Sequence, residues 1–222
     1  AQLAPGSAVV WCAGAPGHTG AMHDLAETVG AVYGRGGRSN CFWAPVSLRK
    51  RKDGSTAVFP HFVFDRAKPG TVIVNQKGQR YYNESTSYHL TGITMQEANA
   101  QAPSVPSFLV TDANGMRKYG LGMVRPNGMG LRAGIADGYI VQGQTLEELA
   151  GKLGIDATHL KQAAADIGRF AQTGVDEQFQ RGTTTYQRAN GDATWTGPNP
   201  SLGPIETAPF YALRLYLSLI HI

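Results

Sequence analysis

Helical periodicity is clearest in the last third of the chain. Leucines recur at the spacing of one helix face over residues 146–153, and a capping box opens this segment at Thr145. A second apolar stripe over residues 160–171 follows Asp156, which can cap the next helix, and Gly174 stops it. These patterns predict two consecutive amphipathic helices.

Short β-rich runs separated by turn residues occupy the middle of the chain. Strands are expected at residues 57–59, 62–64, 71–74, 80–82 and 107–111. The Asn-Gln-Lys-Gly sequence at 75–78 is a hairpin signal, a helix is expected around 94–100, and residues 112–115 are expected to turn the chain. Strands that precede helices, instead of alternating with them, predict an α+β architecture.

The first 45 residues are expected to form a loop, a helix and a second loop. Glycines crowd residues 14–20, apolar residues then fall at helical spacing over 22–29, and Gly30 is placed as a C-cap. A glycine-rich loop that enters a helix presents backbone N–H groups to an anion. A tight turn that binds nothing is the alternative interpretation of this loop.

Composition places the chain among globular proteins. Its 222 residues are 42% hydrophobic, which suits one or two domains with a buried core. Two Cys cannot form a disulfide framework, so a reducing compartment is expected. No apolar run is long enough to span a bilayer, and the first residues lack the charged and apolar regions of a signal peptide. A cytoplasmic location is therefore the default expectation.

Charge and histidine placement argue against a nucleic-acid partner and a metal. The formal net charge is only +4, and the one dense basic run, at 49–52, is followed by an Asp-Gly turn signal. A solvated turn is therefore favoured there over a phosphate-binding patch. The six His show no spacing typical of a zinc site, and the motifs of α/β-hydrolases and P-loop proteins do not occur. We therefore expect no nucleic acid and no metal among the ligands.

Residues 78–88 read Gly-Gln-Arg-Tyr-Tyr-Asn-Glu-Ser-Thr-Ser-Tyr. This block resembles the Gly-x-Arg-Phe-x-Asn-Glu motif of a large FAD-dependent oxidoreductase family, which contains fumarate reductase and succinate dehydrogenase flavoproteins and 3-ketosteroid Δ1-dehydrogenases. Other segments resemble the same family in the same order: 14–20 with 30–31, 42–45, 68–75, 118–120, 137–140, 145–150, 174–179 and 209–212. The likeness covers nearly all of residues 5–216.

The resemblance implies a domain organisation. In that family a smaller α+β capping domain interrupts an α/β Rossmann-like FAD-binding domain, and the substrate lies between them against the flavin. Residues 1–48 would be the C-terminal part of the first FAD-domain segment, 49–205 the capping domain, and 206–216 the return to the FAD domain. The family's dinucleotide fingerprint and its C-terminal flavin-contacting stretch are absent here. We therefore expect a fragment that holds FAD poorly by itself.

The last six residues, 217–222, break the preceding pattern. Their sequence, Leu-Ser-Leu-Ile-His-Ile, resembles the conceptual translation of a common transposase sequencing adapter. This likeness predicts that the native part ends near Tyr216, and the absence of an initiating Met fits a fragment. A genuine short apolar strand is the alternative.

Two features bear on the chemistry within the family. Fumarate reductases use cationic groups for two carboxylates, but Phe-Trp-Ala-Pro at 42–45 stands where they have His-Pro, and residues 85–88, directly after Glu84, include no Arg. The sequence at 83–88 instead resembles the Asn-Glu-Ser-x-x-Tyr of the steroid dehydrogenases. That likeness implies that Tyr88 takes the proton beside a ketone while the neighbouring carbon gives hydride to flavin N5. A phenol needs a charged or hydrogen-bonded setting to act as such a base.

Candidate site residues follow from the resemblance. Tyr88 and Glu84 are the expected catalytic residues, and Gly17, Thr19 and Gly20 are expected to contact FAD. For these residues the structural alternatives are a half-buried aromatic after a hairpin, a carboxylate that braces a turn, and a tight loop.

Aromatic residues suit a flat apolar substrate, and Trp43 and Tyr211 are the expected substrate contacts. Trp43 could instead be a core residue, and Tyr211 could pack at the domain junction. Arg80 is expected to pair locally with an acidic residue.

Three hypotheses therefore remain open. In the favoured hypothesis the chain is part of an FAD-dependent dehydrogenase that desaturates a ketone next to its carbonyl. The ketone is apolar and steroid-like or otherwise bulky, and the sequence leaves the electron acceptor unknown. The second is a fumarate-type flavoprotein whose cations come from the missing C-terminal part or from Arg125 and Arg132. The third is a flavin-free α+β binding module.

Overall fold

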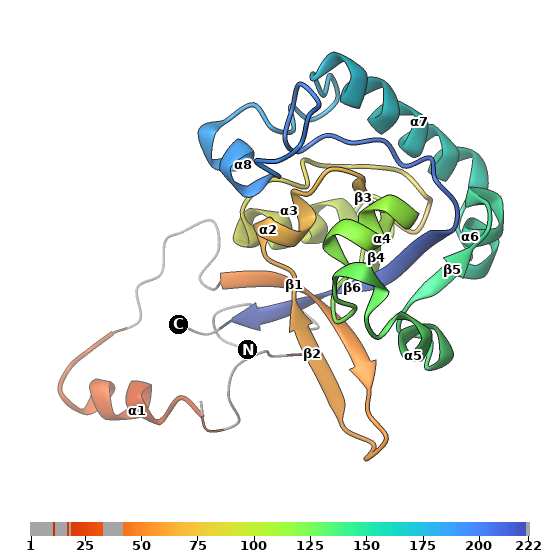
Figure 1. Cartoon of the computed structure of the whole chain (residues 1–222). Helices are drawn as coiled ribbons and strands as arrows, with labels where there is room; N and C mark the ends of the chain where they lie inside the picture. The colour runs from red at the N-terminus through yellow and green to blue at the C-terminus, as the bar shows by residue number, and fades with distance from the viewer. Residues whose placement is uncertain (1–10, 12–16, 18, 33–41, 221–222) are drawn as a thin grey trace.

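A six-stranded antiparallel sheet organises the part of the chain that the structure, a computed structural model, describes: residues 11, 17, 19–32 and 42–220 (Figure 1). The strands are β1 (Phe42–Lys50), β2 (Thr56–Pro60), β3 (Thr71–Val74), β4 (Ser107–Thr111), β5 (Val141–Gly143) and β6 (Phe210–Ile220). The helices are α1 (Ala21–Thr28), α2 (Val63–Arg66), α3 (Tyr88–Asn99), α4 (Ala113–Tyr119), α5 (Leu131–Ala136), α6 (Leu146–Leu153), α7 (Ala157–Thr173) and α8 (Thr185–Asn190), with a 3₁₀ turn at Pro126–Gly128.

Strand β6 connects the two halves of the sheet. The strand order is β2-β1-β6-β4-β3, and β5 also pairs with β6. The end of β6 pairs with β1 from Phe42↔Ile220 to Val46↔Tyr216. Its first half pairs with β4 on one side and with β5 on the other. Strands far apart in the sequence therefore depend on β6 to form one sheet.

Alternating residues of β3, β4 and β6 face two different cores. Val72, Phe108 and Ala212 point to the core that α6 and α7 cover. Ile73 and Leu213 point to the opposite core, where residues of α3, α4 and the segment before β5 pack. This period-two alternation is the reason that β-rich runs with apolar residues at successive positions form buried strands.

The locally encoded elements confirm the sequence predictions. The Thr145 side chain accepts a hydrogen bond from the N–H of Glu148 at the start of α6. Asp156 does the same for His159 at the start of α7. Gly154 and Gly174 then end these two helices in the left-handed conformation. Strands β2, β3 and β4 also lie where strands were predicted.

Three element predictions were wrong. Residues 62–64 do not form a strand, because the backbone turns into α2 directly after Phe62. Residues 112–115, expected to turn the chain, instead begin a helix: the Asp112 side chain accepts from the N–H of Gly115 and caps α4. Residues 42–45 are not loop but the first half of β1, since β6 provides their partner.

Two further segments differ in extent. Helix α3 begins at Tyr88, six positions before the expected start, because Ser87 caps it and its side chain accepts from the N–H of Leu90. The expected strand at 80–82 is reduced to a single bridge between Val74 and Arg80.

The expected domain boundaries do not coincide with breaks in the sheet. The boundary at residues 48–49 lies inside β1, and residues 210–216 of the expected FAD-domain return lie in β6. Residues 217–220 continue that strand. The domain assignment and the adapter origin of the last residues stay predictions. None of the helices in the described ranges is both long and apolar enough to cross a bilayer.

Candidate active site

Tyr88 is the first residue of α3, where the segment that carries the Asn-Glu-Ser motif enters the helix. Its ring is half-buried and meets the ring of Phe62 edge to face, with 5.1 Å between ring centroids. Phe62 precedes α2, so the contact joins the starts of two helices. A partly exposed phenol against an aromatic wall can meet a flat substrate.

The neighbouring tyrosines are unsuited to proton transfer. Tyr82 is 4% exposed, and burial raises its pKa to about 12. Burial also raises the pKa of Tyr81 well above its ordinary value, and its hydroxyl pairs with Ser107 Oγ at 2.8 Å. Among the three tyrosines at 81, 82 and 88, Tyr88 therefore has the phenol best placed to act on a ligand.

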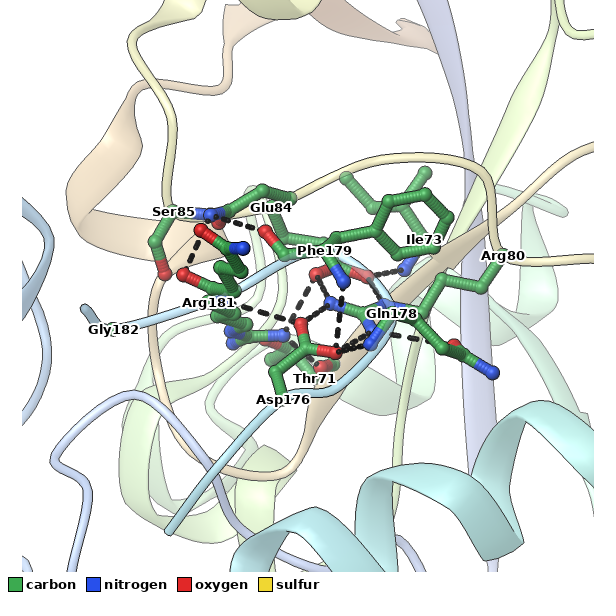
Figure 2. Close-up of polar contacts among 12 residues, drawn as sticks. Thr71, Ile73, Arg80, Glu84, Ser85, Asp176, Gln178, Phe179, Arg181 and Gly182 are labelled. Carbon is green, nitrogen blue, oxygen red and sulfur yellow. Dashed lines mark hydrogen bonds and ion pairs between the residues drawn. The ribbon is translucent and has the colours of Figure 1, made fainter.

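Glu84 is enclosed by donors (Figure 2). Its side chain has no exposed surface, and Arg80 binds it through two hydrogen bonds of 2.8 Å, from Nε to Oε1 and from Nη2 to Oε2. The backbone N–H of Ile73 donates to Oε1, and Arg181 Nη1 lies 3.3 Å from Oε2. This environment matches the bracing alternative for Glu84, and its catalytic role stays a prediction.

Asp176 completes the network from a distant part of the sequence. Arg80 Nη1 and Nη2 donate to its two oxygens at 2.9 and 2.6 Å, and the backbone N–H of Arg181 also donates to it. The Arg80 guanidinium lies over the Phe179 ring, 4.9 Å from its centroid. The local acidic partner expected for Arg80 is confirmed as Glu84. The second partner lies 96 residues away.

Stability is expected to fall with acid because of these two carboxylates. Burial alone would raise the pKa of Glu84, but the charges of Arg80 and Arg181 outweigh it, and the folded-state pKa lies below the ordinary value. For Asp176 burial acts in the same direction, and the Arg80 hydrogen bonds and charge again outweigh it. A lowered folded-state pKa adds stability that is fully present above the ordinary carboxyl range and is lost as the pH falls through the folded value.

Urea unfolding at pH 7, pH 4 and pH 3 measures this effect. The free energy of unfolding should decline below about pH 4, where carboxylates of unfolded chains begin to take up protons. A Glu84→Gln chain should show a weaker decline, since it has lost one of the two titrating groups. An unchanged free energy between pH 7 and pH 3 would contradict the assigned network.

The expected substrate residues lie in the core. Trp43 of β1 is 3% exposed and packs against Ile93 of α3. Tyr211 of β6 is 6% exposed and belongs to the core that includes Leu109. Their positions match the packing alternatives, and a substrate contact for either residue stays a prediction.

Gly92 allows α3 to approach β1 closely, and Gly92→Ala tests that contact. A Cβ at this position would lie 2.2 Å from Trp43 Cβ, so the helix must shift, and we expect the free energy of unfolding to fall by about 1–3 kcal/mol. Gly168→Ala in α7 is the matched control, because a Cβ there has no neighbour within 4 Å outside its own helix turns. It should stabilise the chain by about 0.5–1 kcal/mol. Equal effects in urea unfolding would rule out the close approach.

The expected cofactor residues precede α1. Thr19 donates its N–H to the carbonyl of Gly17, and Gly20 takes the N-cap position with φ of +84° and no capping side chain. The N–H of His23 donates to the carbonyl of Gly20, and the glycine offers no side chain to the N–H groups of Ala21 and Met22. A helix N-terminus of this kind fits the phosphate part of a dinucleotide. The other loop residues, 12–16 and 18, lie outside the described residues.

Helix α1 carries an apolar face that the described residues do not cover. Met22, Leu25 and Val29 are 72%, 59% and 84% exposed, and Figure 1 shows α1 apart from the sheet and the other helices. Gly30 follows the helix with φ of +86°, as its C-cap role requires. The helix was predicted correctly, but its apolar spacing does not reflect packing against described residues.

A buried hydrogen-bonded chain near Phe62 was not singled out from the sequence. His61 is fully buried, and its Nδ1 and Nε2 lie 2.5 Å from Asp65 Oδ2 and 2.7 Å from Ser47 Oγ. The Ser47 hydroxyl also lies 2.7 Å from that of Tyr139. The four residues tie β1, α2 and the segment before β5 together. The i, i+4 spacing of His61 and Asp65 is the one sequence signal that could have suggested part of it.

Arg66 is another polar residue that the sequence analysis did not single out. It has no exposed surface, and each of its three guanidinium nitrogens donates to a main-chain carbonyl. The arginines considered for a dicarboxylate, Arg125 and Arg132, are exposed. Within residues 11, 17, 19–32 and 42–220, no three His, Cys, Asp or Glu side chains are grouped to hold a metal ion.

Comparison with known proteins identifies relatives of the chain. It is 38% identical over 177 residues to the 4-oxocyclohex-2-ene-1-carboxylate 5-dehydrogenase of Sinomonas cyclohexanicum, a match that covers 79% of this chain and 29% of that protein. It is 32% identical over 211 residues to the 3-oxosteroid 1-dehydrogenase of Mycobacterium tuberculosis, which covers 92% of this chain and 36% of that protein. The chain thus spans about a third of the length of these relatives.

Solved structures and family models agree with these matches. The 3-ketosteroid Δ1-dehydrogenase of Sterolibacterium denitrificans superposes with a TM-score of 0.78 at 31% identity, over 93% of this chain and 36% of that one. A family model described as "FAD binding domain" matches residues 1–221. Since this match includes nearly every residue, the chain belongs to the FAD-binding domain family.

Proposed function

We propose that this chain is part of an FAD-dependent dehydrogenase that desaturates a cyclic ketone next to its carbonyl, with Tyr88 as the proton acceptor. The observation that carries the proposal is the position of Tyr88, half-buried at the start of α3 against Phe62, within the Asn-Glu-Ser-x-x-Tyr motif. The carboxylate of the same motif, Glu84, is occupied by internal donors and so is a poor competitor for the role of base.

FAD is the cofactor of the family, and when bound it supplies the acceptor for a hydride from the substrate. Gly17, Thr19 and Gly20 would hold its phosphate part at the N-terminus of α1, which has no capping side chain. The chain's own contribution to the chemistry is to orient the ketone and to take a proton from the carbon beside the carbonyl. The Tyr88 hydroxyl would receive that proton, and Phe62 would keep the ring in place.

The substrate class follows from the named relatives and from the departures from the fumarate reductases. One of the named relatives is a 4-oxocyclohexene carboxylate dehydrogenase and the other a 3-oxosteroid dehydrogenase. A six-membered ring with a ketone is common to both names. Tyr88 meets the aromatic ring of Phe62, and an aromatic wall suits such a ring better than it suits a dicarboxylate. In this proposal residues 49–205 act as the capping domain over the substrate.

A turnover assay with the flavin-loaded enzyme tests the proposal. In one assay the enzyme is given 4-oxocyclohexanecarboxylate or a 3-oxosteroid together with an artificial dye that accepts electrons. In the other it is given fumarate together with a reduced dye that donates electrons. Dye reduction with a cyclic ketone, together with an unsaturated product, is the expected result. Turnover of fumarate alone would replace the proposal with a fumarate-type reaction. A flavin-loaded enzyme that turns over none of them would favour a binding module.

A further inference from the structure

We propose that Arg66 is the positioning residue for Tyr88: one buried guanidinium fixes both the loop that leads into the tyrosine and the residue before its aromatic wall. The inference rests on the proposed function, because it gives Tyr88 the role of the base. It concerns a residue outside the Asn-Glu-Ser-x-x-Tyr motif.

The hydrogen bonds of Arg66 reach the segments that lead into both partners of the Tyr88–Phe62 contact. Nη1 donates to the carbonyl of Glu84 at 2.7 Å, and Nη2 donates to the carbonyl of Thr86 at 3.0 Å. These two carbonyls belong to the turn that ends two residues before Tyr88. Nε donates to the carbonyl of His61 at 3.1 Å, directly before Phe62.

The chemistry of the guanidinium makes this arrangement specific. A planar fork with donors in fixed directions can bind three carbonyls at once, whereas a lysine ammonium is a point charge on a flexible stem. Because Arg66 is fully buried, water is not at hand to replace a lost donor, and each abandoned carbonyl would be left unsatisfied. The positions of both turns therefore depend on this side chain.

Neighbouring interactions hold in place the two segments to which Arg66 donates. The His61 ring is bound by Asp65 on one side and by Ser47 on the other, so its carbonyl is a fixed acceptor. On the other end, Glu84 is held by Arg80 and by Ile73 of β3. Arg66 thus connects two anchored points, and the rings of two residues that closely follow them in the sequence, Tyr88 and Phe62, meet edge to face.

The test compares Arg66→Lys with the unchanged enzyme by two measurements. Ring-labelled tyrosine NMR of the chain reports the setting of Tyr88, with the signal assigned from Tyr88→Phe. In the flavin-loaded enzyme, kcat and KM are measured with a ketone and with the same ketone deuterated beside the carbonyl. We expect the Tyr88 signal to shift and broaden, and kcat to fall by about 100-fold with KM little changed, as a misplacement of about 1 Å would cause. The isotope effect should rise because proton removal becomes slower.

Arg181→Lys is the matched control. Arg181 is also fully buried and donates to the main-chain carbonyls of Thr71, Arg66 and Lys68. It reaches the turn before Tyr88 only through the Glu84 side chain, with 3.3 Å between Nη1 and Oε2, and donates to none of the carbonyls of that turn. It should lower stability and leave the isotope effect unchanged. If Arg66→Lys leaves the Tyr88 signal and the isotope effect as they are, or if Arg181→Lys changes them equally, Arg66 is a structural arginine only.

A second variant decides the matter if Arg66→Lys does not fold. Phe62→Leu removes the aromatic ring that Tyr88 contacts and leaves no buried charge unpaired. Like Arg66→Lys, it should shift the Tyr88 signal and raise the isotope effect. No change in either would overturn the inference. If the unchanged enzyme turns over no ketone, the proposed function fails, while the NMR comparison still decides whether Arg66 positions Tyr88.

Discussion

Tyr88→Phe is expected to lower kcat for a cyclic ketone by about 10²–10⁴-fold, because the variant keeps the ring but removes the group that takes the proton. The hydroxyl is lost from a half-buried side chain, so the ring can still pack against Phe62 and stability should change little. Dye reduction in the steady state measures the rate, and thermal unfolding monitors the fold.

Tyr186→Phe is the control for the loss of a phenol. Tyr186 lies on α8 and is 48% exposed, so both kcat and stability should equal those of the unchanged enzyme. A Tyr88→Phe enzyme with undiminished kcat would remove Tyr88 from the mechanism. Since burial raises the pKa of Tyr81 and of Tyr82, neither would be a ready replacement.

Glu84→Gln should have the largest effect on stability. Glutamine keeps the size of the side chain but removes the negative charge that Arg80 and Arg181 face. Removing one partner from a buried ion pair leaves an uncompensated buried charge, which costs about 3–5 kcal/mol. Urea unfolding at pH 7 measures the loss.

Glu177→Gln provides the comparison for an exposed ion pair. Glu177 pairs with Arg169 at 2.7 Å, but its side chain is 63% exposed. Such pairs contribute about 0–1 kcal/mol, so the variant should be nearly as stable as the unchanged chain. A loss of similar size in both variants would mean that the Arg80 network gains little from its burial. Under conditions where the Glu84→Gln enzyme stays folded, its kcat also separates a bracing role for Glu84 from a catalytic one.

Structural features that depend on residues close together in the sequence could be predicted from it. Thr145 and Asp156 each satisfy an N–H three residues away, so both caps could be recognised without knowledge of the fold. Strand β4 was recognisable because five consecutive buried positions require a β-rich run. Tyr88 and the FAD cofactor came from the resemblance of residues 78–88 to a family, not from periodicity.

Long-range contacts explain what the sequence could not predict. Arg80 was expected to have a local acidic partner, but no local pattern indicates that Asp176 would approach the same guanidinium. The fully buried state of Arg66 depends on carbonyls from two separate turns. Residues 42–45 became a strand because β6 pairs with them, although their own sequence contains Pro45. In each case the partner is too far away along the sequence for secondary-structure propensity or helix capping to indicate it.

The place of β6 in the sheet has a consequence for the growing polypeptide. Until residues 210–220 leave the ribosome, the β1–β2 hairpin and the β3–β4 pair have no strand between them, and both carry an open edge. Open edges are templates for pairing with other chains, and pairings between distant residues form slowly. Nascent chains that stall before Phe210 should therefore depend on chaperones to avoid aggregation, whereas chains that have released β6 can close the sheet by themselves.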